Sequence, residues 1–130
     1  NHTGLKFAVA GAVALQPAVA ERWEAVTGVP ITQGYGLTES SGVVSINIPG
    51  ARFNGTVGLP LPSTEVSIRD DDGRELAPEE KGEICLRGPQ ITQGYWQRPA
   101  ETAAAFFEGG WFRGYWMSSL QLVISPELHF

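Results

Sequence analysis

Residues 34–39, which read Gly-Tyr-Gly-Leu-Thr-Glu, bring two glycines, an aromatic ring, a hydroxyl and a carboxylate into one short segment. Glycine lets a backbone approach a ligand closely, and a tyrosine can lie against a flat ring. A threonine hydroxyl can donate to a phosphate oxygen, and a glutamate can hold Mg²⁺, which prefers oxygen ligands. This 34–39 segment therefore suits a nucleotide with metal-bound phosphates. It equally suits a strand that ends in a glycine turn with Thr38 as a helix cap, and local chemistry leaves both interpretations open.

A strand, a helix and a second strand are predicted to position this segment. The apolar run at residues 5–12 predicts the first strand, residues 16–27 predict the helix, and residues 30–35 predict the second strand. Pro17 suits the first turn of a helix, and Gly28 suits the position just after its end. The apolar residues of the predicted helix share one face at helical spacing, namely Val19, Trp23 and Val26.

The order of these elements places two turns at the same edge of a sheet. Strand, helix and strand indicate a parallel βαβ unit, whose crossover is usually right-handed. Ligands of open α/β sheets bind beyond the carboxyl ends of the strands. The bend at Gly11 and Ala12 and the 34–39 segment follow those two ends. We therefore expect the two segments to lie side by side as candidate nucleotide contacts.

The second half of the chain changes to the alternating pattern of antiparallel strands. Residues 65–69 and 83–87 predict strands, and residues 91–95 predict a further one. The Asp-Gly pair that ends residues 70–73 predicts a tight, solvated turn, which we prefer to a calcium site because the alternating ligands of an EF-hand are missing. Residues 99–107 predict a short helix that ends before two glycines.

Several motifs accompany the 34–39 segment in a defined order. They are the apolar segment at residues 5–15, Gly-Leu-Pro-Leu-Pro at 58–62, Gly-Glu-Ile-Cys-Leu-Arg-Gly-Pro at 82–89, Gly-Tyr-Trp at 94–96 and Gly-Trp-Phe-Arg at 110–113. In this order and spacing the chain resembles the adenylate-forming acyl-CoA synthetases, and among them the long-chain fatty acid–CoA ligases, over about residues 5–113. The resemblance implies that ATP and a carboxylate give an acyl-adenylate and pyrophosphate, and that coenzyme A thiol then displaces AMP.

The resemblance implies an α/β (α+β) fold that forms part of the large N-terminal domain of such an enzyme. Residues 1–50 would supply the βαβ piece of a mainly parallel sheet with its nucleotide-contact turns. Residues 51–113 would form a small antiparallel β-subdomain, and residues 114–130 are an aberrant or unassigned tail.

The resemblance also implies roles for individual residues. Gly11 and Ala12 would form the turn beside adenine, and Tyr35 would lie against the base. Thr38 would contact the α-phosphate and Glu39 would hold Mg²⁺, because charge that develops at phosphorus needs fixed donors and a metal. The other residues of the segment would line the same loop and border the acyl pocket: Gly34, Gly36 and Leu37.

The remaining motifs are given structural roles. Residues 57–60 match a family segment near the acyl pocket, with a structural turn as an equal alternative. We interpret residues 82–83 and 94–96 as scaffolding, and we expect Trp96 and Trp111 to pack in a core. Cys85 lies in an apolar run and is expected to be a buried structural thiol.

The sequence departs from the family pattern after Arg113. There the family continues with Thr-Gly-Asp, whose aspartate holds the ribose hydroxyls, whereas this chain reads Gly-Tyr-Trp. The chain also contains neither the Ser/Thr/Gly-rich phosphate loop nor the catalytic lysine of the C-terminal domain. We therefore interpret it as an internal fragment and expect it to be inactive alone.

Composition limits the partners. The net charge of −5 and a sequence pI near 4.9 argue against nucleic acid, and one cysteine excludes an internal disulfide framework. No apolar run reaches the ~18 residues of a membrane-spanning helix. The expected substrates are a fatty acid, ATP with Mg²⁺, and coenzyme A. We expect a cytoplasmic protein and leave peripheral membrane contact open.

Two alternatives to a fatty acid ligase remain. One is an adenylating enzyme for another carboxylic acid, since the shared motifs do not separate the substrates. The other is a non-catalytic binding domain that retains only the scaffold. Acyl chain length and oligomeric state cannot be read from the sequence.

Overall fold

The computed structural model describes residues 4–77 and 80–116, which fall into two compact units. Of the described residues, the first unit comprises 4–36 and 43–61, and the second comprises 37–42, 62–77 and 80–116. Most of the predicted 114–130 tail lies outside the described residues. The predicted division of the adenylation domain at residue 50 stays a prediction.

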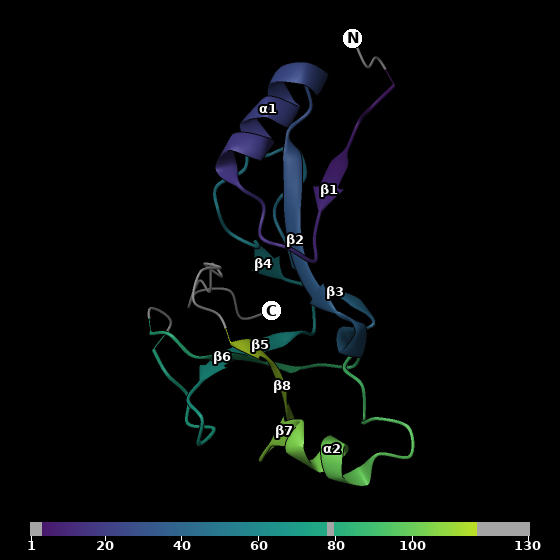
Figure 1. Ribbon diagram of the computed structural model, residues 1–130, viewed down its shortest axis with the longest axis vertical. Helices are drawn as coiled ribbons and strands as arrows, with labels where there is room; N and C mark the ends of the chain where they lie inside the picture. The colour runs from purple at the N-terminus through teal and green to yellow at the C-terminus, as the bar shows by residue number, and fades with distance from the viewer. Residues whose placement is uncertain (1–3, 78–79, 117–130) are drawn as a thin grey trace. The chain divides into compact units, whose positions relative to one another are not determined.

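The first unit begins with the predicted βαβ arrangement (Figure 1). Strand β1 (Ala8–Ala10) is followed by helix α1 (Pro17–Thr27) and strand β2 (Ile31–Leu37). The two strands are parallel, with Ala8 opposite Ile31 and Ala10 opposite Gln33. This pairing confirms the parallel unit and brings the residues that follow β1 beside those in the second half of β2.

Helix α1 begins one residue after the predicted start, with Gln16 as its N-cap, and ends at the predicted residue. Pro17 occupies its first turn, and Gly28 ends it in the left-handed region, with φ 72° and its N–H donating to Glu24 O at 2.8 Å. Of the helix residues, Ala20 is the buried one. The predicted apolar face is exposed in this chain, so it adds little to the core: Val19, Trp23 and Val26.

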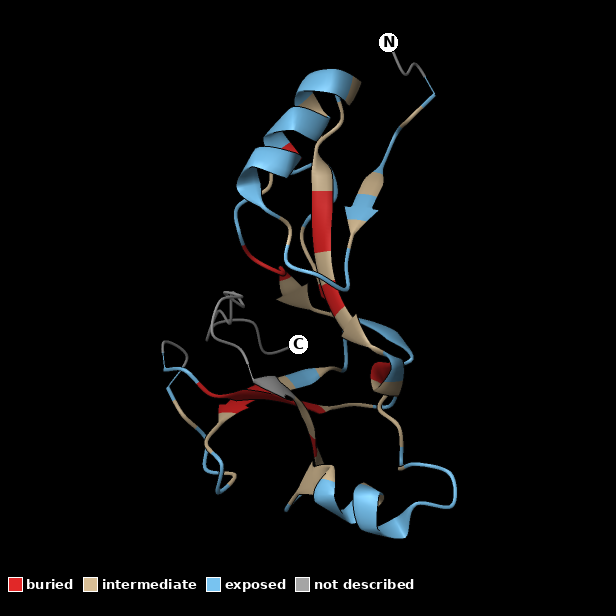
Figure 2. Ribbon diagram, viewed as in Figure 1, coloured by how far each residue is buried: buried red, intermediate tan, exposed pale blue. Residues whose placement is uncertain are grey.

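The first unit is completed by strands β3 (Gly42–Ile46) and β4 (Leu59–Pro60), which pair antiparallel in a sheet of order β1-β2-β3-β4. The sheet therefore combines a parallel pair with an antiparallel one. Its core includes Val44 and Val57, which are almost completely buried, and a buried stretch of β2 (Figure 2).

The second unit is the predicted antiparallel sheet, in the order β5-β6-β8-β7. Its strands are β5 (Glu65–Arg69), β6 (Glu83–Arg87), β7 (Phe106–Phe107) and β8 (Trp111–Trp116), and helix α2 (Pro99–Ala104) precedes β7. Four of the five residues of β6 are buried (Figure 2). Cys85 lies among them, which confirms a buried thiol, and burial raises its pKa to about 12.

Three predictions for the second half of the chain are wrong. Residues 91–95 form no strand, because hydrogen bonds inside a turn use the backbone instead. The predicted 99–107 helix ends at Ala104, since Phe106 turns into β7 and packs edge-on against Phe112 at 5.4 Å between ring centroids. Trp96 is 87% exposed rather than in a core.

A tight turn and a group of charged side chains accompany the second sheet. The predicted turn at residues 70–73 is confirmed, with the Gly73 N–H donating to Asp70 O at 3.0 Å. The guanidinium groups of Arg69 and Arg87 lie over the ring of Trp111, at 4.4 and 4.5 Å from its centroid.

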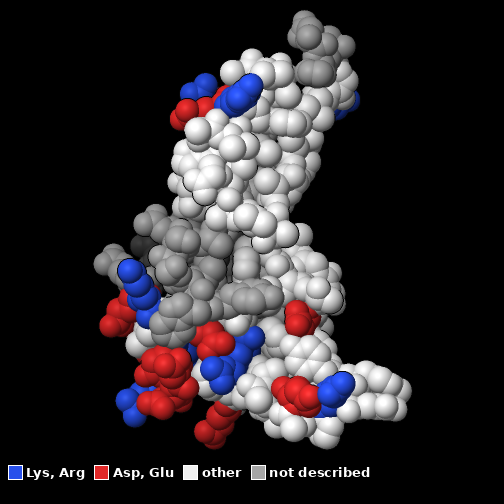
Figure 3. Space-filling model, in the orientation of Figure 1, with Lys and Arg blue, Asp and Glu red and all other residues white. Residues whose placement is uncertain are grey.

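On the face visible in Figure 3, acidic and basic side chains are intermixed over the described residues rather than sorted by sign.

Candidate nucleotide site

The bend after β1 lies beside the second half of β2, as predicted from the strand order. A Cβ added at Gly11 would lie 3.6 Å from Gly34 O, so the two backbones are in van der Waals reach. Ala12, which follows, is exposed and adopts φ 69°, a left-handed conformation that alanine rarely takes. The first unit thus presents a tightly turned stretch of backbone beside β2.

Near the end of β2, the two glycines and the largely buried Tyr35 leave more backbone than side chain available for contact. Gly34 faces β3, where an added Cβ would come within 3.1 Å of Ser45 O. Tyr35 exposes 9% of its surface, so little of its ring is open in this chain. Its predicted contact with adenine stays a prediction, as does the role of Gly36, which is partly buried.

Residues 57–60 are anchored to β3 in the same unit. Gly58 has φ 85°, and a Cβ there would collide with the backbone of Ile46 and Asn47. The Ser45 hydroxyl donates to Val57 O at 3.0 Å. These contacts give the segment a structural reason for its glycine, and its proposed place near an acyl pocket stays a prediction.

After β2 the chain enters a single 3₁₀ turn, η1 (Thr38–Ser40). Leu37 occupies the N-cap position and Thr38 is the first residue of the turn, while the hydroxyl of Ser40, the third residue, accepts the Leu37 N–H at 2.9 Å. The same hydroxyl lies within donating distance of Gly42 O at 2.7 Å. The capping interpretation of Thr38 is therefore wrong, and its side chain is exposed with no hydrogen bond among the described residues.

Glu39 is held at two points, through its main chain and through its side chain. Its main-chain oxygen accepts the Thr92 N–H at 2.7 Å, and its carboxylate Oε1 accepts the Tyr95 hydroxyl at 2.9 Å. The side chain is partly buried, and within the described ranges no hydrogen bond reaches its other oxygen, Oε2. Sequence reasoning missed Tyr95, although the Gly-Tyr-Trp motif that contains it was a visible signal.

The available ligands fit a metal that arrives with phosphates. Within the described parts of the chain, no group of three or more His, Cys, Asp or Glu side chains could hold a metal ion by itself. Mg²⁺ commonly takes one or two carboxylates and completes its shell with phosphate oxygens and water. Glu39 has a partly exposed carboxylate with one oxygen unengaged, so this donor set suits Mg·ATP better than a free-standing metal centre.

The predicted residues thus divide between the two units. The first unit brings together the bend after β1 and most of β2, whereas the 3₁₀ turn lies in the second unit and continues directly from β2. In the first are Gly11, Ala12, Gly34, Tyr35 and Gly36; in the second are Leu37, Thr38 and Glu39.

Comparison with known proteins identifies the family. Residues 1–96 match the model of the AMP-binding enzymes, and the chain belongs to this family. It is 44% identical over 128 residues to a long-chain-fatty-acid–CoA ligase of Salmonella typhimurium, covering 98% of this chain and 22% of that protein. It is 42% identical over 114 residues to the enzyme of the same name from Bacillus subtilis, covering 86% and 20%.

Solved structures agree with the fold. A crystal structure of the anthranilate CoA ligase AuaEII in complex with anthranoyl-AMP matches with a TM-score of 0.78 and 30% identity, over 85% of this chain and 21% of that one. The chain therefore spans about a fifth of the length of these relatives. The Salmonella alignment includes most of residues 114–130, although the residues after Arg113 still lack the expected acid. Among the described residues, no helix has the length and apolar character needed to cross a membrane.

Proposed function

We propose that this chain is the nucleotide-contacting part of an ATP-dependent long-chain fatty acid–CoA ligase. The observation that carries the proposal is the 34–39 segment, which leads from a paired strand into a turn where Thr38 is exposed and Glu39 is fixed. The two relatives named above support the fatty acid as substrate, since both bear the long-chain name at 42–44% identity.

The candidate residues would have different roles, according to the chemical groups that they present. The backbone at Gly11 and Ala12, with Tyr35, would provide the surface for adenine, while the Thr38 hydroxyl would donate to an α-phosphate oxygen. Glu39 would hold Mg²⁺, which when bound offsets the negative charge of the phosphates. In the first reaction a fatty acid carboxylate attacks the α-phosphorus and pyrophosphate leaves. In the second, the coenzyme A sulfur attacks the acyl carbonyl and AMP leaves.

The proposed enzyme needs residues that this chain does not contain. We propose that residues 1–50 and 51–113 act as the βαβ portion and the β-rich subdomain of one adenylation domain, with ribose, pyrophosphate and lysine contacts supplied by other residues. We also propose a cytoplasmic location, with peripheral contact to membranes as a source of fatty acid.

A different carboxylic acid is the second candidate. The specific observation in its favour is the likeness to the anthranilate ligase, which is bound to an aryl adenylate. The structure of this segment would serve either acid, because the proposed contacts concern the nucleotide.

The test uses the complete polypeptide encoded by the gene that contains this sequence. Acid-dependent exchange of pyrophosphate into ATP is measured with palmitate, octanoate, benzoate and anthranilate. We expect palmitate to give the fastest exchange, and the isolated 130-residue chain to give none. Faster exchange with an aryl acid would replace the substrate, and no exchange with any acid would overturn the ligase proposal.

A further inference from the structure

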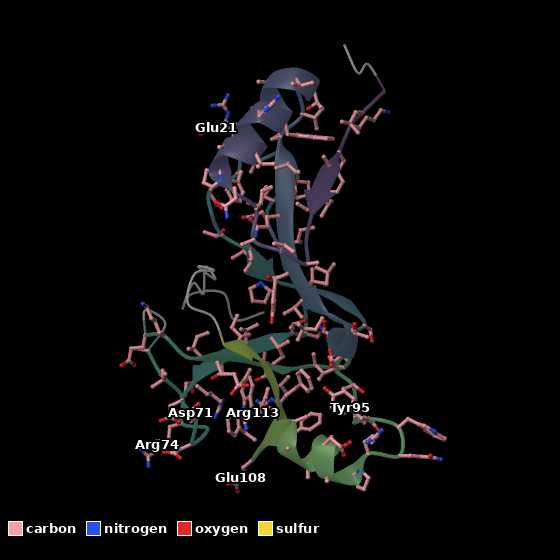
Figure 4. All side chains as sticks on the ribbon, viewed as in Figure 1. Glu21, Asp71, Arg74, Tyr95, Glu108 and Arg113 are labelled. Carbon is pink, nitrogen blue, oxygen red and sulfur yellow. The ribbon has the colours of Figure 1, made fainter. Side chains whose placement is uncertain are left out.

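The turn between β6 and α2 holds Glu39 at two separate points. One is the backbone bond from the Thr92 N–H to Glu39 O, and the other is the side-chain bond from the Tyr95 hydroxyl to Glu39 Oε1. Figure 4 shows Tyr95 on this turn, just before α2. Both residues and η1 belong to the second unit, so the contact lies inside one compact body.

The local sequence explains why a tyrosine arrives there. The Thr92 hydroxyl donates to Gly94 O at 2.9 Å and accepts the Gly94 N–H at 3.3 Å, which closes the turn. Thr102 of α2 then accepts the Tyr95 N–H on its hydroxyl at 2.9 Å. A Cβ at Gly94 would lie 2.5 Å from a methyl carbon of Thr102, and Gly94 has φ 151°, so only glycine fits without movement.

The contact gives the two carboxylate oxygens different surroundings. Oε1 accepts a hydrogen bond from a phenol, whereas Oε2 has no hydrogen bond within the described residues. A carboxylate fixed by one oxygen loses less freedom when the other binds a cation, and partners of metal ligands tune affinity in this way. A scaffolding role for the Gly-Tyr-Trp motif does not account for a bond that ends on this particular carboxylate.

We propose that Tyr95 is a positioning residue: it holds Glu39 by Oε1 and leaves Oε2 for the Mg²⁺ that accompanies ATP. This rests on the proposed function of Glu39. It assigns the Gly94-Tyr95 turn to the metal-binding machinery, and Thr102 acts behind it by fixing the Tyr95 backbone.

The test measures ATP affinity rather than turnover. The complete gene product is titrated with ATP by calorimetry, with saturating Mg²⁺ and with EDTA, and the ratio of the two dissociation constants reports the metal's contribution. Replacing a hydrogen-bond partner of a metal ligand typically costs about 10- to 100-fold in metal affinity. For the partly exposed Tyr95 we expect the ratio to fall about tenfold in Tyr95→Phe.

A double-mutant comparison separates positioning from general support. Because Tyr95 acts through Glu39, Tyr95→Phe should change the ratio little in a Glu39→Gln background. The matched control is Trp96→Phe, which removes part of the adjacent, 87% exposed ring and should leave the ratio unchanged. Thr102→Ser retains the hydroxyl and should also leave it unchanged, whereas Thr102→Val should lower it. Thermal melting of each variant shows that it folds.

The outcomes distinguish the two proposals. The positioning role of Tyr95 is overturned if a folded Tyr95→Phe variant keeps the wild-type ratio of dissociation constants. It is also overturned if Tyr95→Phe changes that ratio equally in the wild-type and Glu39→Gln backgrounds. Either result leaves the proposed metal-binding role of Glu39 intact. If Glu39→Gln itself keeps the wild-type ratio, the proposed metal-binding role of Glu39 fails, and the positioning role falls with it.

Discussion

The predicted contact residues differ in kind between the two units: those of the first offer backbone shape, and those of the second offer side-chain oxygens. In the first, Gly11 and Gly34 bring two backbones together, and Ala12 turns the chain in an unusual conformation. In the second, Thr38 and Glu39 expose a hydroxyl and a carboxylate. A flat base needs a surface of the right shape, whereas phosphates need fixed donors and a metal. Substitutions in the first unit should therefore act through side-chain size, and substitutions in the second unit through side-chain chemistry.

The largest expected effect comes from the charge of Glu39. Glu39→Gln retains the size and an acceptor for the Tyr95 hydroxyl but removes the negative charge, so the rate of pyrophosphate exchange should fall about 10²–10³-fold, as when one preorganised catalytic donor is lost. Glu108→Gln is the control, because Glu108 is an exposed acid of the same unit, well separated in sequence from η1. Equal rates for the two variants would show that the negative charge of Glu39 makes no specific contribution to the reaction.

The next effect concerns shape in the first unit. Gly58→Ala combines a positive φ with a collision against the Ile46 and Asn47 backbone, so the free energy of unfolding should fall by about 3 kcal/mol. Gly55→Ala is the matched control: Gly55 has φ 79° but open space around it, and it should lose only about 1 kcal/mol. Urea unfolding of both variants measures the difference. Equal losses would show that conformation alone, and not close packing, requires Gly58.

A smaller effect of opposite sign is expected at the bend. Ala12→Gly removes the strain of alanine at φ 69° and should raise the free energy of unfolding by up to about 1 kcal/mol. Ala14→Gly lies in the same loop without a positive φ and should instead lower it slightly, because glycine makes the unfolded chain more flexible. A destabilised Ala12→Gly variant would mean that the bend is not strained.

The smallest effect near neutral pH is expected in the core of the second unit. Burial raises the pKa of Cys85 from 9.0 to about 12, so the folded state keeps a proton that the unfolded state loses. Its contribution to stability is complete below pH 9 and declines as the pH rises from about 9 toward 12. Urea unfolding at pH 8 and pH 10 should show this decline, and Cys85→Ala should reduce it. At pH 8 the native thiol should react with a disulfide reagent far more slowly than the unfolded one.

Much of the first unit could be predicted because its signals are local. Pro17 and Gly28 mark the ends of α1 through their own backbone preferences, and the order of strand, helix and strand placed Gly11 beside Gly34. Two assignments in the second unit failed because nearby side chains compete for the same backbone, which residue types alone do not decide. Phe106 pairs in β7 and packs against Phe112 instead of continuing the predicted helix, and the Leu37 N–H is bonded by the Ser40 hydroxyl.

The sequence by itself determined the family, the parallel strand pair and the types of group presented at the 34–39 segment, because these follow from residue identity and spacing. Only the tertiary structure decided that Tyr35 is largely buried and that Tyr95 reaches Glu39. The hydrogen bond joins Tyr95 to Glu39, which lies 56 positions earlier in the sequence. Contacts of that range depend on how whole elements fold back on one another, and no local pattern records them.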